Sequence, residues 1–151
     1  MNIFILDNCP IKSAKWQVDR HVVKMILETA QLLCSIFEPN TAPYKRTHYN
    51  HPCSIWARES YDNYKWLLTH GLALCDEYTN RYSKHHKSKE IIIWCANNVK
   101  PEMFSKSEKT EHPKCMPDDC KVDDAVMSYR NYYRTHKRHI ATWKQNRPEW
   151  Y

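Results

Sequence analysis

Glycine is almost missing from this chain, which carries one, Gly71, among 151 residues. Loops that cradle phosphates with successive glycines are therefore excluded, and so is a turn-dense β fold, because tight turns rely on backbone conformations that glycine adopts most readily. Long apolar runs are missing too, since no stretch approaches the roughly 18 apolar residues of a membrane-spanning helix. Helices are therefore the expected main structural material.

The seven cysteines are an odd number, and no charged segment followed by an apolar run opens the sequence. Both features favour a soluble protein in a reducing environment, cytoplasmic or otherwise inside a host cell. Cys34, Cys53 and Cys75 fall within helical patterns and are most simply small core residues.

Positive charge exceeds negative charge, with 23 Lys and Arg against 17 Asp and Glu, which gives a net charge of +6. Six Trp, ten Tyr and three Phe accompany these charges. Cations mixed with aromatic rings are typical of proteins that bind nucleic acid. The length fits one domain, so we expect residues 1–151 to share a single core.

The most informative segment is a predicted helix, Val18–Phe37, that is apolar around most of its circumference. Its polar residues form one narrow stripe: His21, Lys24, Glu28, Gln31 and Ser35. At about 100° per residue, Glu28 falls about 20° from His21 and two turns further along. Ordinary surface helices have a broader polar face. The stripe therefore indicates a cleft that gathers imidazole, ammonium and carboxylate, although a solvated edge gives the same pattern.

Two further helices are predicted. Pro52 opens the second, which runs from about Cys53 to Tyr82, and 3,4 spacing marks a third between Val122 and Trp143. Between them, Ile91–Trp94 fits either a helical turn or a strand. Polar residues around the second helix form either a candidate pocket or a set of core hydrogen bonds: His48, His51, Glu59 and Asn63. Basic residues of the third form a candidate phosphate track: Arg130, Arg134, Lys137 and Lys144.

A zinc site is a competing interpretation of the loop-rich region. His112, Cys115 and Cys120, joined by Cys95 or His51, are zinc-ligand types. The spacing between Cys115 and Cys120 is wider than in zinc ribbons, however, and no second tight pair exists. We therefore predict no metal and no cofactor.

Two segments, one in the first predicted helix and one at the end of the sequence, carry motifs that can be compared with known families. Val18–Glu28 places a His and a Glu seven residues apart on the first long helix, and Arg147-Pro-Glu-Trp-Tyr151 closes the chain. Both resemble the pyrimidine-dimer DNA glycosylases of phages, the family founded by the small phage endonuclease V. The resemblance implies a compact, all-α single domain of three main helices with long irregular loops.

The resemblance also implies a reaction in which an N-terminal amine attacks C1′ of a damaged nucleotide and forms an imine. Met1 or Asn2 would supply the amine, Glu28 would assist proton transfer, and His21 would hold or orient the substrate. An α-amine titrates near pH 7.7 to 8.0, so part of it is neutral and nucleophilic at neutral pH.

The same resemblance implies contacts with DNA outside that centre. The candidate DNA-binding residues are Lys24, Gln31, Arg130, Arg134, Lys137, Arg147, Trp150 and Tyr151. The chain departs from the family where Leu27 and Gln31 replace two arginines that flank the catalytic Glu. Phosphate or lesion contacts at those two positions are thus expected to differ.

The sequence thus predicts a monomeric DNA glycosylase with AP lyase activity that acts on a damaged or modified pyrimidine in duplex DNA and has no membrane partner. A pyrimidine dimer is the first substrate to test. Two alternatives stay open: a noncatalytic nucleic-acid-binding protein, and a different base- or nucleotide-processing enzyme on the same scaffold.

Overall fold

The computed structural model describes all 151 residues as an all-helical protein, which confirms the predicted fold class. Its helices are α1 (Pro10–Lys15), α2 (Asp19–Cys34), α3 (Pro52–Glu59), α4 (Tyr61–Tyr82), α5 (Lys89–Asn98) and α6 (Ala125–Thr135). Short 3₁₀ turns cover Pro101–Met103, Asp118–Cys120 and Arg138–Ile140. None of the helices combines the length and the apolar character needed to cross a membrane.

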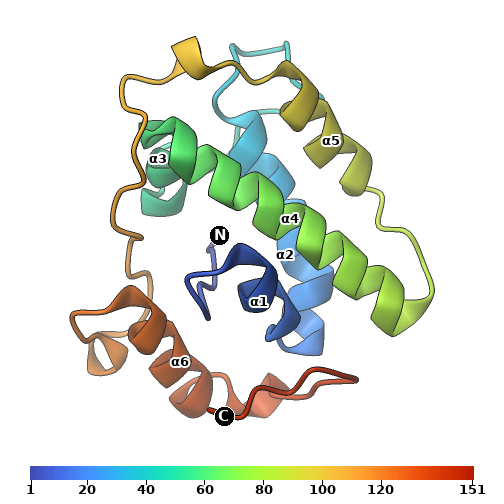
Figure 1. Cartoon of the computed structure of the whole chain (residues 1–151), viewed down its shortest axis with the longest axis vertical. Coiled ribbons are helices and arrows are strands. Elements are labelled where there is room, and N and C mark those ends of the chain that lie inside the picture. Colours follow the sequence, from blue (N-terminus) through green and yellow to red (C-terminus); the bar gives the residue numbers. More distant parts are fainter.

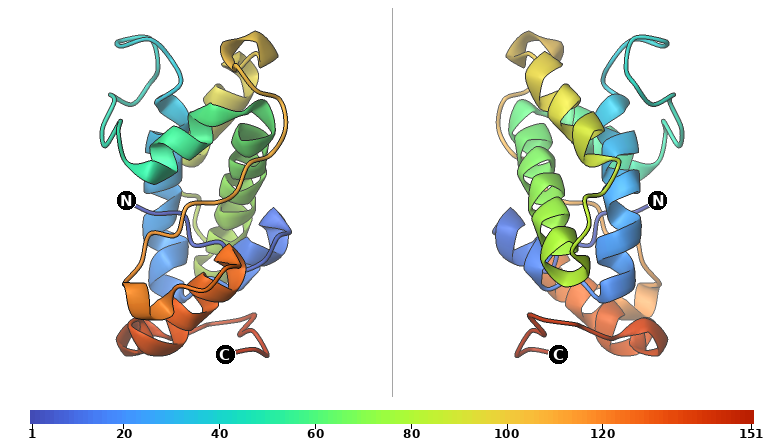
Figure 2. Two further views of the ribbon diagram at one scale, coloured as in Figure 1. Left: turned by 90° about the vertical axis from the view of Figure 1, so that its left-hand side faces the viewer. Right: turned by 90° about the vertical axis from the view of Figure 1, so that its right-hand side faces the viewer.

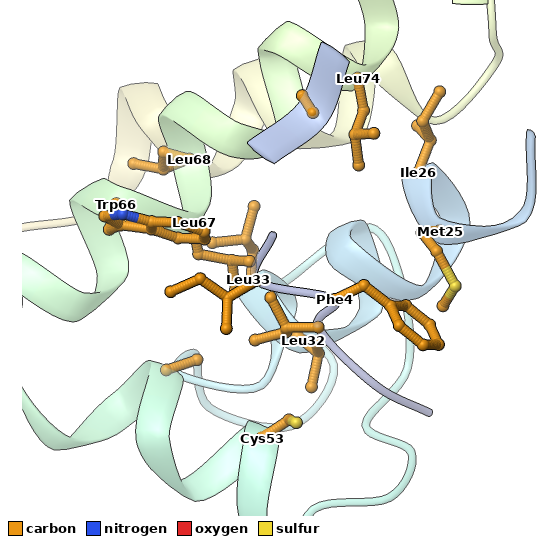
Figure 3. Packing of buried hydrophobic residues seen from close by; sticks show 14 of the residues in the cluster. Phe4, Met25, Ile26, Leu32, Leu33, Cys53, Trp66, Leu67, Leu68 and Leu74 are labelled. Carbon is orange, nitrogen blue, oxygen red and sulfur yellow. The ribbon is translucent and has the colours of Figure 1, made fainter. Parts of the chain in front are cut away.

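The two longest helices, α2 and α4, form the centre of the molecule. In Figure 1, α4 crosses in front of α2, α5 lies toward one end of the pair, and α1, α6 and the C-terminal segment lie toward the other. Leu33 of α2 and Leu67 of α4 are fully buried and meet where the helices face each other (Figure 3). Burial of such apolar side chains is the main stabilising contribution to the fold.

The predicted first helix is observed, although it ends at Cys34 rather than at Phe37. Its apolar positions Val22, Ile26, Ala30 and Leu33 are fully buried, as the periodicity predicts. The helix ends because the Ser35 hydroxyl donates to the Leu32 carbonyl, 2.6 Å away, which competes with continued backbone pairing.

The predicted second helix is in fact two helices, because the chain breaks at Ser60. Ser60 has extended backbone angles, φ −144° and ψ 156°, and its side chain caps α4 by accepting from the Asn63 N–H at 3.0 Å. The next two backbone N–H groups donate to the carbonyls of Lys106 and Ser107. The break is thus a tertiary effect, since those partners lie more than 40 residues away in the sequence.

The predicted third helix is shorter than its apolar spacing suggested. Asp124 caps α6 through a hydrogen bond from the Met127 N–H, and the helix ends at Thr135, well before Trp143. The Ile91–Trp94 island is helical and belongs to α5. Helix α1 was not predicted, although Pro10 at its first position is a recognised helix-start signal.

Residues 1–6 run extended into the core between α2 and α4 (Figure 2), and Ile3 to Leu6 are buried. Side chains, rather than a neighbouring strand, satisfy this backbone. The Phe4 carbonyl accepts from Ser13 and Gln17, the Ile3 carbonyl from His112, and the Leu6 carbonyl from Arg130. Buried backbone groups need such partners, so these polar side chains fix the path of the N-terminal segment.

Gly71 lies where α4 approaches α2 and α5. A Cβ atom at this position would lie 2.9 Å from Thr29 Cγ2 and 3.1 Å from Ile92 Cδ1. We expect Gly71→Ala to lower the free energy of unfolding by about 1–2 kcal/mol, because overpacking outweighs the gain in helix propensity of roughly 1 kcal/mol.

Urea unfolding of Gly71→Ala, of Thr29→Ser and of the double variant would measure this effect. Removal of the Thr29 methyl should recover part of the loss, so the two changes should be coupled. A Gly71→Ala protein at least as stable as the wild type would contradict the close packing.

Candidate active site

The N-terminal amine and the Glu28 carboxylate meet at the edge of the core. The Met1 nitrogen lies 3.1 Å from Glu28 Oε1, and the Asn2 N–H donates to the same oxygen at 3.2 Å. Glu28 is only 8% exposed. The two groups line one cavity of about 190 Å³ together with Asn2, Phe4, His21, Lys24, Met25, Tyr132 and Lys137. A carboxylate beside a primary amine can accept its proton.

Residue 2 is held in place by its own side chain. The Asn2 amide donates to the Cys115 carbonyl at 2.9 Å, and its Oδ1 accepts from the Tyr129 hydroxyl at 2.8 Å. These bonds connect the N-terminal segment to the loop before α6 and to α6 itself. The amine is thereby positioned by residues more than 110 positions away in the sequence.

His21 is buried beside the same cavity. Its ring stacks on Phe4 with centroids 4.0 Å apart, and its Nδ1 lies 2.7 Å from the Tyr133 hydroxyl. Burial, helped by the nearby positive charges of Lys137 and Lys24, lowers the pKa of His21 to about 3. The imidazole is therefore neutral at physiological pH and suits a positioning or hydrogen-bonding part better than that of a cation.

Two lysines line the same cavity as the carboxylate. Lys24 Nζ lies 3.9 Å from Glu28 Oε2 with its side chain 73% exposed, and Lys137 Nζ lies 5.1 Å from the Tyr132 ring centroid. Gln31 continues the stripe one turn beyond Glu28 and is half-buried, whereas Ser35 is buried and its hydroxyl accepts from Ser54. The stripe therefore faces the cavity at His21, Lys24 and Glu28.

The predicted basic and aromatic residues near the C-terminus gather at a separate place. Arg130, Arg147 and Trp150 line a larger cavity of about 630 Å³ with Lys15, Trp16, Asn146 and Glu149. Arg130 also donates to the Leu6 carbonyl, and Arg134 donates to the Trp150 carbonyl. The Arg147 guanidinium lies 5.4 Å from the Tyr151 ring centroid. Two arginines of the predicted phosphate track, Arg130 and Arg134, therefore donate hydrogen bonds within the protein.

The polar set around the second predicted helix does not line any of the cavities. Asn63 is fully buried and bonded to the Trp56 carbonyl and to Thr110, while Glu59 accepts from the Thr110 hydroxyl. His48 is exposed, and His51 caps α3. The contacts of Asn63 are thus those of a residue that forms hydrogen bonds within the core, rather than those of a pocket residue.

The zinc set considered from the sequence is separated in space. His112 is buried, with its Nε2 3.0 Å from the Ile3 carbonyl. Cys120 lies instead beside Asp119 and His136, and Cys115 lies beside Cys53. His112, Cys115 and Cys120 therefore do not form one site.

Residues 1–90 match the family model of the pyrimidine dimer DNA glycosylases. The chain belongs to this family. The matched part includes the N-terminal segment, His21, Glu28 and helices α1 to α4, whereas α6 and the C-terminal segment lie outside it. No curated protein and no solved structure gives a significant match to the chain.

Sequence reasoning missed three residues around the candidate centre of this glycosylase-family protein. Tyr132 lines the cavity, Tyr133 contacts His21, and Tyr129 holds Asn2. All three lie on α6. Tyr129 and Tyr133 belong to the 3,4 spacing that predicted the third helix, which indicated only a core face, and Tyr132 lies outside that spacing. Their contacts depend on how α6 packs against the N-terminal segment, for which the sequence carries no local signal.

Three buried histidines make the stability of this protein sensitive to acid. Burial is the main cause that lowers the pKa of His21 and His112 to about 3 and that of His70 to about 4. The unfolded chain therefore binds more protons below about pH 6.5, so the free energy of unfolding falls as the pH falls. Each histidine contributes about 1.4 kcal/mol per pH unit between that value and its folded pKa.

Urea unfolding at pH 7 and pH 5 would measure this loss before most carboxylates titrate. We expect His70→Gln to reduce the slope by about a third, since it removes one of three similar contributions. His85→Gln, at an exposed position, is the matched control. A slope that stays the same in His70→Gln would contradict the assignment.

Proposed function

We propose that this protein cleaves a glycosidic bond of pyrimidine dimers in duplex DNA and then cleaves the strand through an imine intermediate. The observation that carries the proposal is the N-terminal amine 3.1 Å from Glu28 Oε1 at a cavity wall, in a chain of the pyrimidine dimer DNA glycosylase family. Imine chemistry requires a primary amine with a nearby proton acceptor, whereas DNA binding alone does not require this pair.

In the proposed reaction, Glu28 accepts a proton from the terminal ammonium. The freed nitrogen lone pair attacks C1′, and the bond between C1′ and the base breaks with its electron pair leaving on the base. The attached nitrogen then loses a second proton, which the released base takes up through solvent. The sugar ring opens as Glu28 returns its proton to O4′, which leaves a protonated imine at C1′ and a Glu28 carboxylate. Removal of a C2′ proton, assisted by Glu28, drives β-elimination and breaks the bond between C3′ and its phosphate oxygen.

The size and the charges of the cavity support attack at a sugar. About 190 Å³ is below the roughly 300 to 1,000 Å³ of pockets that enclose drug-sized ligands, so it suits a sugar edge rather than a whole dimer. Lys24 and Lys137 at its walls can neutralise flanking phosphates. The lesion must leave the base stack to be reached. A dimer already stacks poorly, so less free energy is needed to displace it from the duplex.

Borohydride trapping on three matched duplexes tests the proposal. One duplex contains a thymine dimer, one an abasic site, and one no lesion. We expect a stable covalent adduct with the first two and none with the third, because borohydride reduces only an imine that has formed at C1′.

An adduct on the abasic duplex alone would retain the lyase step and reject the dimer as substrate. Absence of any adduct, with binding that weakens steeply as salt rises, would overturn the enzymatic proposal and favour the DNA-binding alternative.

A further inference from the structure

Three side chains from two separate parts of the chain converge behind the N-terminal segment. His51 caps α3, Cys53 lies in its first turn, and Cys115 belongs to the loop that precedes the 3₁₀ turn Asp118–Cys120. The two sulfur atoms are 3.8 Å apart, and one donor atom from each of the three residues lies within 4.8 Å of the others. The proposed glycosylase reaction assigns no part to any of these three side chains.

This separation fits a shared zinc ion. Two thiolates on one tetrahedral zinc, each about 2.3 Å from the metal, lie about 3.8 Å apart. Cysteine sulfur and imidazole nitrogen are the ligands that zinc prefers. Three protein ligands leave the fourth position for water, as in open zinc sites.

The site is reachable and can rearrange to bind. Cys53 is buried, whereas His51 and Cys115 are half-buried, so an ion can enter from the surface. His51 Nδ1 accepts from the Cys53 N–H at 3.1 Å. Metal binding through Nδ1 would break this bond, whereas binding through Nε2 would leave it in place. The two thiol sulfurs already lie side by side.

The other candidate groups lack this combination. Cys34 and Cys95 also place their sulfurs 3.7 Å apart, but no third ligand accompanies them. The cluster of Asp119, Cys120 and His136 has one thiol, and its carboxylate and imidazole already share a hydrogen bond, with His136 Nε2 2.9 Å from Asp119 Oδ2. Both groups therefore serve as internal controls.

We propose that His51, Cys53 and Cys115 form a zinc site that clamps the loop around Cys115 to the start of α3. The Cys115 carbonyl accepts the hydrogen bond from the Asn2 side chain, so the ion would stabilise the loop that positions the N-terminal segment. This proposal replaces the expectation, drawn from the sequence, that the chain holds no metal.

Cobalt titration of the full-length, metal-free protein tests the site under anaerobic, reducing conditions. Thiolate ligation gives charge-transfer absorption in the near ultraviolet, and zinc should displace the cobalt. We expect one equivalent per chain in the wild type and in the controls Cys95→Ala and Cys120→Ala. Cys115→Ser should lose most of the absorption. His51→Asn removes the imidazole ligand, so the affinity for cobalt should fall at least tenfold. The Asn side chain keeps a capping oxygen for α3, so the fold should persist.

Circular dichroism of each variant separates lost binding from lost structure. Absence of the absorption in the wild type would overturn the proposal, and so would its persistence in Cys115→Ser or its loss in Cys120→Ala. A protein that binds no metal but forms a disulfide between Cys53 and Cys115 when the reductant is removed would also overturn the proposal, and would assign the pair to redox chemistry. The readout is metal binding, so it is independent of the glycosylase proposal.

Discussion

Replacing Glu28 by Gln is expected to lower the rate of strand cleavage on dimer-containing duplex DNA by about 10²- to 10⁴-fold. The amide cannot accept the proton of the terminal ammonium or take the C2′ proton from the imine. Its oxygen can still accept from the Asn2 N–H, which the carboxylate now receives at 3.2 Å, so the local geometry should persist. The contact with exposed Lys24 is long and contributes little to stability.

Single-turnover cleavage measured on denaturing gels gives this rate, and DNA affinity measured by fluorescence anisotropy provides the necessary comparison. Binding should be retained, because the change removes a negative charge rather than a cation. Glu90→Gln, on the exposed side of α5, is the matched control and should cleave at the wild-type rate. A Glu28→Gln rate within tenfold of the wild type would remove Glu28 from the chemistry.

The features that sequence reasoning located are local ones. The periodicity of residues 18–37 predicted α2 to within a few residues and predicted which of its side chains are buried. It also found the stripe in which His21 and Glu28 share one face, because helical geometry alone fixes their relation. The family resemblance added the link between Glu28 and the chain terminus, which are 3.1 Å apart in the structure.

The missing features depend on contacts between distant segments. Ser60 breaks the second predicted helix because the backbone beyond it pairs with Lys106 and Ser107, and no glycine or proline marks that break. The N-terminal segment has too few residues for a periodicity, yet its burial determines where the amine lies. Cys53 and Cys115 are 62 residues apart, so their proximity follows only from the packing of the loop against α3.

Blocking the N-terminal amine is expected to abolish imine trapping altogether, because the proposed reaction assigns the attack on C1′ to this amine. Lys24 and Lys137 line the same cavity, but the Met1 nitrogen lies 3.1 Å from Glu28 Oε1, closer than the 3.9 Å between Lys24 Nζ and Glu28 Oε2. Acetylation of the terminus, or extension of the chain by two residues before Met1, removes the primary amine from its place beside Glu28. DNA affinity should change little in either form.

Shortening the chain by one residue should have a different result. The Asn2 nitrogen lies 3.2 Å from Glu28 Oε1, close to the 3.1 Å of the Met1 nitrogen, and the Asn2 side chain is anchored independently by Cys115 and Tyr129. A protein that begins at Asn2, released by protease cleavage of a fusion, should therefore still trap DNA. Mass spectrometry of the peptide crosslinked to DNA identifies the attached nitrogen in each form. An adduct that survives in the extended protein, with the sugar on a lysine, would show that the nucleophile is a side chain and that Glu28 serves another group.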